Sequence, residues 1–171
     1  NIGWKHVFTK KLYGLFSGHY SNYQNKVESL NSGMNSFTMD YSILYNEGRA
    51  EFNYFLNSDH TMNFGVNAIK YEVSPGSLRP AGTNSYMTAL DLPVEQAIEA
   101  AVFVSDEHNV NNKLSFSYGL RYSHFFALGP ALVYTYPEGV PRSVKNRFDS
   151  TTYDSNEVMS QSGGPELRLS A

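Results

Sequence analysis

Large and small side chains alternate along residues 113–126, and this is the clearest structural pattern in the chain. Every even position is large and mostly apolar, whereas the odd positions up to Ser123 are small or charged. A period of two places the two sets on opposite faces of one β-strand. The segment exceeds the ~5–6 residues usual in soluble strands. An aromatic face opposite Lys113 and Arg121 is typical of a transmembrane β-strand, with lipid on one side and water on the other.

Similar alternation predicts other strands along the chain, while residues 1–10 are expected to form a turn that leads into the first of them. Residues 94–106 also fit a helix, because Asp91 could serve as its N-cap and Pro93 could occupy its first turn. Their position before a clear strand favours a strand instead. The predicted strands cover residues 11–23, 36–56, 61–73, 94–106 and 113–126, and a last strand begins near Glu166.

The apolar phase changes within the second predicted strand. Phe37 and the alternate residues up to Tyr45 form one apolar set, and Ala50 starts a second set in the opposite phase. The change falls at Gly48. It predicts either a β-bulge or the point at which the strand leaves a membrane.

The connections between the predicted strands alternate between long and short. Tight turns are expected at residues 57–60 and 107–112, and long polar loops at 24–35, 74–93 and 127–163, with a turn signal at residues 31–33. Such alternation places the turns at one end of an antiparallel up-and-down meander and the loops at the other. It is the topology of outer-membrane barrels.

Composition narrows the possible functions. The net charge is −3 and the pI about 5.9, so no basic nucleic-acid footprint is present. The mean hydropathy is −0.40, and no run of ~18 apolar residues predicts a transmembrane helix. The 13 Tyr and 11 Phe suit an outer-membrane barrel or a secreted β-sandwich, and the absence of Cys means that no disulfides are needed.

No catalytic group emerges from the sequence, and no enzyme activity, cofactor or metal site is expected. The sequence has no phosphate loop, nucleophile elbow or zinc-binding helix motif. Residues 106–108 (Asp-Glu-His) could do acid–base chemistry, but they fall in a predicted tight turn and are expected to be solvated. Structural or solvated roles are expected for the histidines, because no two share a metal-ligand spacing; they are His6, His19, His60, His108 and His124.

Two groups of polar or aromatic residues are candidates for binding. One is a charged set on the predicted inward face, which would either form a polar network within the wall or contact a passing substrate: Arg49, Glu51, Glu95, Glu99 and Arg121. The other is a set of loop tyrosines, which would either bind ligand at the mouth or pack within the loops: Tyr86, Tyr134, Tyr136 and Tyr153.

Several motifs, in this order and spacing, resemble the barrel strands of TonB-dependent transporters from the Bacteroidota. The likeness covers most of the chain. One departure is that Pro165 precedes Glu166 where the family has Glu before Pro. The residues concerned are 4–8 (Trp-Lys-His-Val-Phe), 60–66 (His-Thr-Met-Asn-Phe-Gly-Val), 111–123 with its Tyr-Gly-Leu-Arg sequence, 127–130, 133–136 and 163–170. Residues 149–151 (Asp-Ser-Thr) also resemble an O-glycosylation acceptor of these bacteria.

The resemblance implies a 22-stranded barrel in the bacterial outer membrane, closed by a plug and driven by TonB. Residues 1–171 are then expected to be a partial barrel domain without the plug, an internal piece of a longer polypeptide. It would hold about five complete strands and the start of a sixth. The implied partners are outer-membrane lipid, the remaining strands and plug of the same polypeptide, TonB and a surface lipoprotein lid. The charged inward residues would contact plug or substrate.

Two alternatives remain open on the sequence alone. One is a secreted all-β binding or adhesion module, in which the Tyr-rich strands pack as a sandwich. The other is a small outer-membrane barrel enzyme, which the missing nucleophile constellation disfavours.

Overall fold

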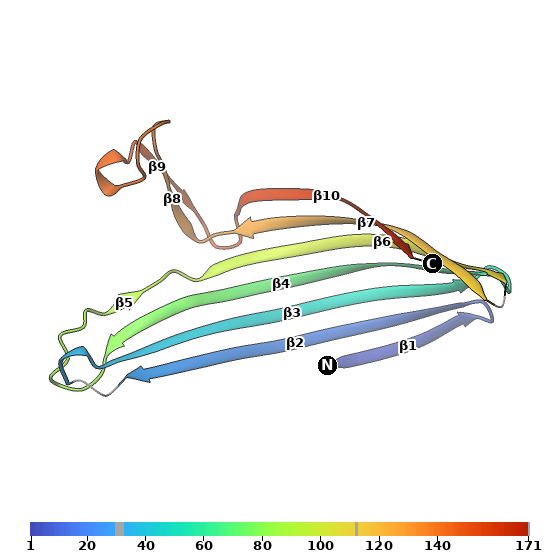
Figure 1. Cartoon of the computed structure of the whole chain (residues 1–171), viewed down its shortest axis with the longest axis horizontal. Helices are drawn as coiled ribbons and strands as arrows, with labels where there is room; N and C mark the ends of the chain where they lie inside the picture. The colour runs from blue at the N-terminus through green and yellow to red at the C-terminus, as the bar shows by residue number, and fades with distance from the viewer. Residues whose placement is uncertain (30–32, 112, 171) are drawn as a thin grey trace.

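The computed structural model describes residues 1–29, 33–111 and 113–170, and this part of the chain is all-β. Long strands account for most of it, and two 3-10 turns interrupt the connections (Figure 1). The elements are β1 (Ile2–Thr9), β2 (Leu12–Ser29), η1 (Gly33–Asn35), β3 (Phe37–Phe55), β4 (His60–Pro80), β5 (Leu90–Asp91), β6 (Glu95–Asn111), β7 (Leu114–Leu128), β8 (Ala131–Thr135), η2 (Val144–Asn146), β9 (Asp149–Tyr153) and β10 (Val158–Ser170).

Most strands form one antiparallel sheet in which sequence neighbours lie side by side. The order is β1-β2-β3-β4-β6-β7-β10, and the short β5 pairs with the loop end of β4. Strands β8 and β9 form a separate hairpin that projects from the sheet (Figure 1). Within the described residues the sheet is open, because β1 and β10 each pair on one side. The predicted antiparallel meander is confirmed.

The predicted separation of short and long connections is also confirmed. The turns between β1 and β2, β3 and β4, and β6 and β7 lie together at one end of the sheet (Figure 1). In the turn before β4, the Asn57 side chain accepts hydrogen bonds from the backbone N–H groups of Asp59 and His60, both at 2.9 Å. This Asx turn reverses the chain within a few residues. The loops before β3, β6 and β10 lie at the opposite end.

Several predicted boundaries were wrong because the strands are longer than the apolar pattern indicated. Residues 1–10 contain β1 and are not just a turn. The predicted loops shrink, since β2 runs to Ser29, β4 to Pro80 and β10 starts at Val158, and the last loop contains β8 and β9. These extensions carry few apolar residues, so their alternation is too sparse to detect. The turn signal at 31–33 lies outside the described residues except for Gly33, which begins η1.

Strand β6 resolves the helix-or-strand alternative at residues 94–106 in favour of a strand. It continues to Asn111, so the predicted turn at 107–112 was too long, and residue 112 itself lies outside the described residues. Residues 106–108 therefore lie on a strand and not in a tight turn. They pair with β4 and β7, and this pairing extends the ladder to the end of the sheet.

No bulge occurs at Gly48. Strand β3 pairs with β2 in one register throughout, from Tyr54 opposite Leu12 to Phe37 opposite Ser29. A register shift occurs near Asp40 instead, opposite the segment of β4 that contains Gly76, whose φ of 149° suits glycine. The phase change at Gly48 is therefore a real exchange of apolar residues between the two faces of a continuous strand.

The sheet has little conventional core. Among the described residues, the buried apolar side chains are Ile69, Ala101 and Leu128, and no side chain is almost completely enclosed. The main sheet has no second layer packed over it, because the two-stranded β8–β9 sheet projects away. Neither 3-10 turn of the described chain has the length and hydropathy that a membrane-crossing helix needs.

Candidate functional site: the inner face of the sheet

The two faces of the sheet differ in burial and in chemistry. Asn67 and Ala101 on one face are 7% and 4% exposed, whereas their strand neighbours Val66 and Val102 on the other face are 50% and 55% exposed. A sheet that curves across its strands towards one face produces this asymmetry. We call the face of Asn67 the inner face and the face of Val66 the outer face.

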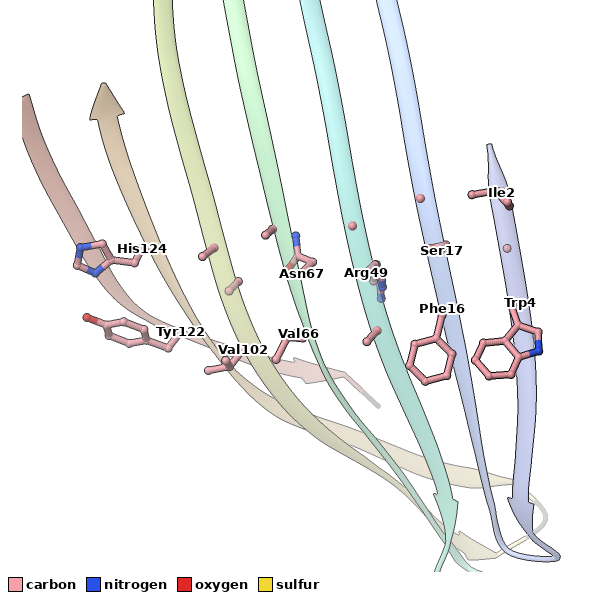
Figure 2. A pocket seen from close by; sticks show the side chains of 17 residues that line it. Ile2, Trp4, Phe16, Ser17, Arg49, Val66, Asn67, Val102, Tyr122 and His124 are labelled. Carbon is pink, nitrogen blue, oxygen red and sulfur yellow. The ribbon is translucent and has the colours of Figure 1, made fainter. Parts of the chain in front are cut away.

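A row of small residues crosses the strands near their middle and separates the two ends of the sheet. Gly18, Gly48, Ala68 and Ala100 are cross-strand neighbours on the outer face, and we call them the boundary row. The half between this row and the short turns is the turn half, and the other is the loop half. Over the small side chains of the boundary row, a groove of about 800 Å³ crosses the outer face (Figure 2).

The outer face of the turn half is apolar. Phe16, Val66, Val102 and Tyr122 lie along neighbouring strands beside the boundary row (Figure 2). The predicted row on β7 is also confirmed as one face, opposite Arg121 in the strand alternation, and its members are exposed: Phe116, Tyr118, Leu120 and Tyr122.

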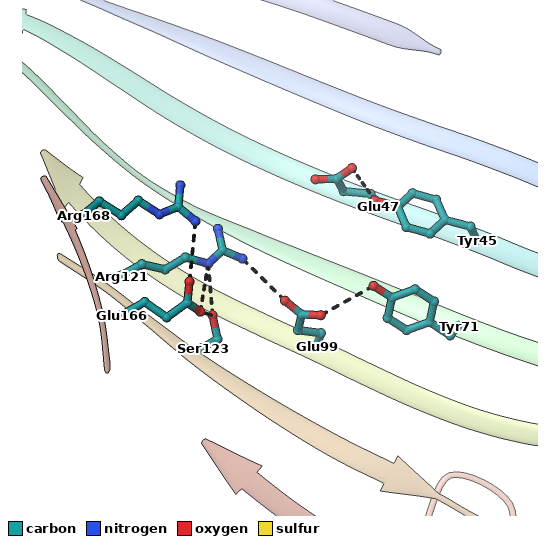
Figure 3. Close-up of polar contacts among 8 residues, drawn as sticks. All are labelled: Tyr45, Glu47, Tyr71, Glu99, Arg121, Ser123, Glu166 and Arg168. Atoms are coloured by element: carbon teal, nitrogen blue, oxygen red, sulfur yellow. Dashed lines mark hydrogen bonds and ion pairs between the residues drawn. The ribbon is translucent and has the colours of Figure 1, made fainter. Parts of the chain in front are cut away.

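The inner face of the turn half carries a charged network centred on Arg121 (Figure 3). Its guanidinium group lies 3.5 Å from Glu99 and 3.8 Å from Glu166, and its Nε donates to Ser123 Oγ at 3.0 Å. Ser123 donates in turn to Glu166 at 2.6 Å. The network joins β6, β7 and β10, so three strands hold the guanidinium group in place.

A second charged group lies on the same face at β3. Arg49 pairs with Glu51 at 2.5 Å, and the Asn63 amide donates to Glu51 at 2.6 Å. The Arg49 guanidinium group also lies 5.3 Å from the centre of the Phe103 ring, two strands away. Gly65 lies between them, and its missing side chain leaves room for this approach.

Two tyrosines extend the inner face into the loop half (Figure 3). Tyr45 donates to Glu47 at 2.6 Å, and Tyr71 donates to Glu99 at 3.5 Å. The hydrogen bond to Glu47, with burial, raises the pKa of Tyr45 to about 12. Burial, followed by the charge of Glu99, raises the pKa of Tyr71. Both phenols therefore stay protonated near neutral pH and keep donating to the carboxylates.

The inner face of the loop half also contains a cavity of about 620 Å³ at the base of the β8–β9 hairpin. Glu95 and Glu99 line it from β6, and Phe125 lines it from β7. Val133 of β8 and Met159 of β10 add apolar surface. Glu95 itself is exposed and joins no hydrogen bond or ion pair among the described residues.

The charged residues predicted to point inward lie on one face of the sheet. The register places Arg49, Glu51, Glu99 and Arg121 on the inner face, and Glu95 lies on the same face of β6 near the loop end. The structure divides them into three places: the Arg49–Glu51 pair, the Arg121 network and the cavity that contains Glu95. Their role in binding stays a prediction.

The loop tyrosines do not form one site. Tyr86 lies on the connection between β4 and β6 and is highly exposed. The other three belong to the hairpin or its edge, where the Arg147 guanidinium group stacks 3.6 Å above the Tyr134 ring. Tyr153 pairs opposite Ala131, and Tyr136 follows the end of β8. Ligand contact by these residues stays a prediction.

Sequence reasoning missed several members of the inner-face groups. Glu166 and Arg168 lie on β10, whose pairing with β7 brings them beside Arg121 and Ser123. No local pattern links residues more than 40 positions apart, so only the strand register could have found them. Asn63 and Tyr71 were assigned to a strand without a polar role.

The outer face at the short turns carries a histidine pair that the sequence did not predict. The His60 and His108 rings stack with centres 4.1 Å apart. His60 Nδ1 lies 2.6 Å from Asp106 Oδ2, which also accepts from the Tyr118 hydroxyl at 2.6 Å. Among the described residues, no cluster of three or more His, Asp or Glu side chains is arranged to hold a metal ion.

No protein-family model matches the chain, and no curated protein or solved structure matches it either. The functional interpretation therefore rests on the sequence and on the geometry of the two faces.

Proposed function

We propose that this chain forms part of the wall of a bacterial outer-membrane β-barrel, within a TonB-dependent transporter that takes up a nutrient actively. The observation that carries the proposal is the inverted distribution of polarity in the turn half. Apolar residues cover its exposed outer face, while the charged network lies on the more buried inner face. A water-soluble sheet places its apolar face inside, whereas a barrel wall in lipid does the reverse.

The height of the apolar band agrees with this proposal. On the outer face of β4 it runs from Met62 through Phe64, Val66 and Ala68, and Lys70 ends it. The flanking polar residues His60 and Lys70 enclose nine residues (61–69) on this strand, and a tilted transmembrane strand needs ~9–11. The histidine pair and Tyr118 lie at the other edge, where polar and aromatic side chains meet lipid headgroups.

The remaining partners follow from the wall and from the sequence resemblance. Strands β1 and β10 expose backbone groups along one side, and hydrocarbon offers them no hydrogen-bond partners. Further strands of the same polypeptide would complete the wall, and a plug would fill it. TonB pulling on the plug would open a path, and a surface lipoprotein lid would cover the loops. The Tyr-Gly-Leu-Arg strand is what favours this transporter class over other barrels.

The membrane part of the proposal can be tested on the chain itself. Residues 1–171, produced without flanking sequence, are expected to aggregate in aqueous buffer and to become dispersed in nonionic detergent, because the outer face has no other cover. Light scattering and size exclusion would follow both conditions. A soluble monomer that unfolds cooperatively in buffer would contradict the proposal and favour the secreted binding module.

The transport part needs the whole polypeptide in cells. Deleting TonB is expected to abolish accumulation of its nutrient while the barrel stays in the outer membrane. Uptake that continues at the same rate without TonB would contradict energy coupling and leave a passive barrel.

A further inference from the structure

We propose that the cavity at the base of the β8–β9 hairpin binds a solute that combines a cationic group, an amine or a guanidinium, with an apolar body. The cavity of about 620 Å³ falls within the ~300–1,000 Å³ typical of small-molecule sites. That this solute is the transported nutrient rests on the proposed function. That the chain binds it rests on the cavity alone.

Apolar side chains form most of the cavity wall. Phe125 and Ala127 of β7 form one side, and Val133 and Met159 come from the hairpin region. Prolines at positions 93 and 130 add rigid apolar surface from two connections. A flat aromatic or short aliphatic body would replace water against these groups and gain free energy by burial.

The charge of the cavity is negative. Glu95 and Glu99 are its charged lining residues, and no Lys or Arg lines it in the described part of the chain. Glu99 already has partners, because Tyr71 donates to it and Arg121 lies 3.5 Å away. Glu95 has no such partner among the described residues and is exposed at the open end. Its carboxylate is therefore the group available to a cation, and a charge-assisted hydrogen bond would fix the orientation of the ligand.

Glu95 and Glu99 are too far apart for Glu99 to replace Glu95 as the partner of a bound cation. They lie four residues apart on one strand, a backbone separation of roughly 13 Å. The Arg121 network holds Glu99 in the deeper part, whereas Glu95 lies at the mouth. A cation at Glu95 would leave the apolar body pointing towards Phe125 and Val133. This arrangement selects a monocation with one apolar end over a compact inorganic cation.

Three probes that share one apolar body separate charge from burial. They are phenethylamine, neutral 2-phenylethanol and phenylacetate, titrated into the full chain in nonionic detergent and observed by ligand NMR, with a detergent-only blank. Phenethylamine is expected to bind about tenfold more tightly than the other two, in line with one charge-assisted hydrogen bond. Equal affinity for the amine and the alcohol would overturn the proposal.

Variants then locate the site. Glu95→Gln is expected to weaken phenethylamine binding about tenfold and to leave 2-phenylethanol unchanged. Glu72→Gln removes a carboxylate from the outer face at a similar height and is expected to change neither. Phe125→Ala should weaken all three probes. Unchanged amine affinity in Glu95→Gln would overturn the assignment even if other variants fold poorly.

The outcome is separable from that of the proposed function. A chain that needs detergent but does not prefer the amine would remove this inference alone. A chain that is monomeric in buffer and still prefers the amine through Glu95 would remove the membrane proposal and keep the binding site.

Discussion

On β3 and β4, the two halves of the sheet place their apolar residues on opposite faces. In the turn half, apolar side chains such as Val66 and Val102 lie on the outer face and charges lie on the inner face. In the loop half, the inner face of β3 and β4 is mainly aromatic and apolar, with Tyr41, Ile43 and Tyr71 among its residues. The outer face there is mainly polar on β2, β3 and β4, where Lys26 lies opposite Asp40 on the neighbouring strand. On β6 and β7 it stays apolar at Ile98 and Phe126.

An exchange of this kind is expected where each face is adapted to its local solvent and not to the strand as a whole. One register runs through both halves of the β2–β3 pair, so no shift of pairing accounts for the exchange. A protein in a single solvent would keep its apolar set on one face. An outer face that meets lipid beside the turns and water beside the loops would require the exchange at the boundary row.

The strongest test of the comparison places the same charge on the outer face of each half. Leu120→Arg puts a guanidinium group within the proposed lipid band and is expected to cost about 2–4 kcal/mol of folding free energy in lipid. Leu44→Arg puts it on the same face in the loop half, opposite Glu72, and is expected to cost ~1 kcal/mol or less. Denaturant titration of the whole polypeptide, folded into lipid vesicles, measures both.

Equal costs for the two Arg variants would contradict the assignment of lipid to one half and water to the other, since they would mean that both halves meet the same solvent. Ser117→Arg on the inner face of the turn half serves as a further control. It keeps the strand and changes only the face, so its cost is expected to be far below that of Leu120→Arg.

A smaller effect is expected when a methyl group is added to a glycine on each face near the boundary row. A methyl group at Gly65 on the inner face would clash with the Ala50 carbonyl oxygen and would lie 2.8 Å from the Phe103 ring. Gly65→Ala is therefore expected to cost roughly 1–3 kcal/mol through overpacking. At Gly48 on the outer face nothing lies within 4 Å, so Gly48→Ala is expected to leave the unfolding midpoint nearly unchanged. A larger loss at Gly48 would show that curvature towards the inner face is wrongly assigned.

The sequence predicted the parts of the fold that depend on periodicity. The alternation around Leu120 placed Arg121 on the opposite face, and the connection lengths placed turns and loops at opposite ends. Strands in the loop half were underestimated, because residues after Tyr23 on β2 alternate mainly between polar side chains. Such a segment pairs through its backbone and leaves little hydrophobic pattern.

The candidate site was less predictable, because it depends on contacts between distant strands. The alternation pattern of residues 94–106 predicted that Glu95 and Glu99 share a face. It did not predict that Glu99 joins a charged network while Glu95 stays unpaired among the described residues. Only the pairing of β10 with β7 brings Glu166 to Arg121, and only the hairpin base adds Val133 to the cavity. Local sequence carries no signal for either contact.

The smallest expected effect is on the outer face of the loop half, which the proposed membrane arrangement places in water. The pKa of Lys26 is raised, first by its hydrogen bond to Glu28 and then by the charge of that carboxylate. Because the folded-state pKa lies above the unfolded value, the contribution of the pair is fully present below the ordinary lysine pKa. It is lost as the pH rises through the folded-state pKa.

Glu28→Gln is therefore expected to return the pKa of Lys26 towards its ordinary value, with a change in unfolding free energy too small to move the midpoint, because both side chains are exposed. NMR titration of the Lys26 Nζ resonances measures the shift, and Glu157→Gln, far along the chain, is the control. A lysine held against hydrocarbon would titrate below its ordinary value, because desolvation disfavours the charged form. A depressed pKa in the unsubstituted protein would thus place this face in lipid and erase the difference between the two halves.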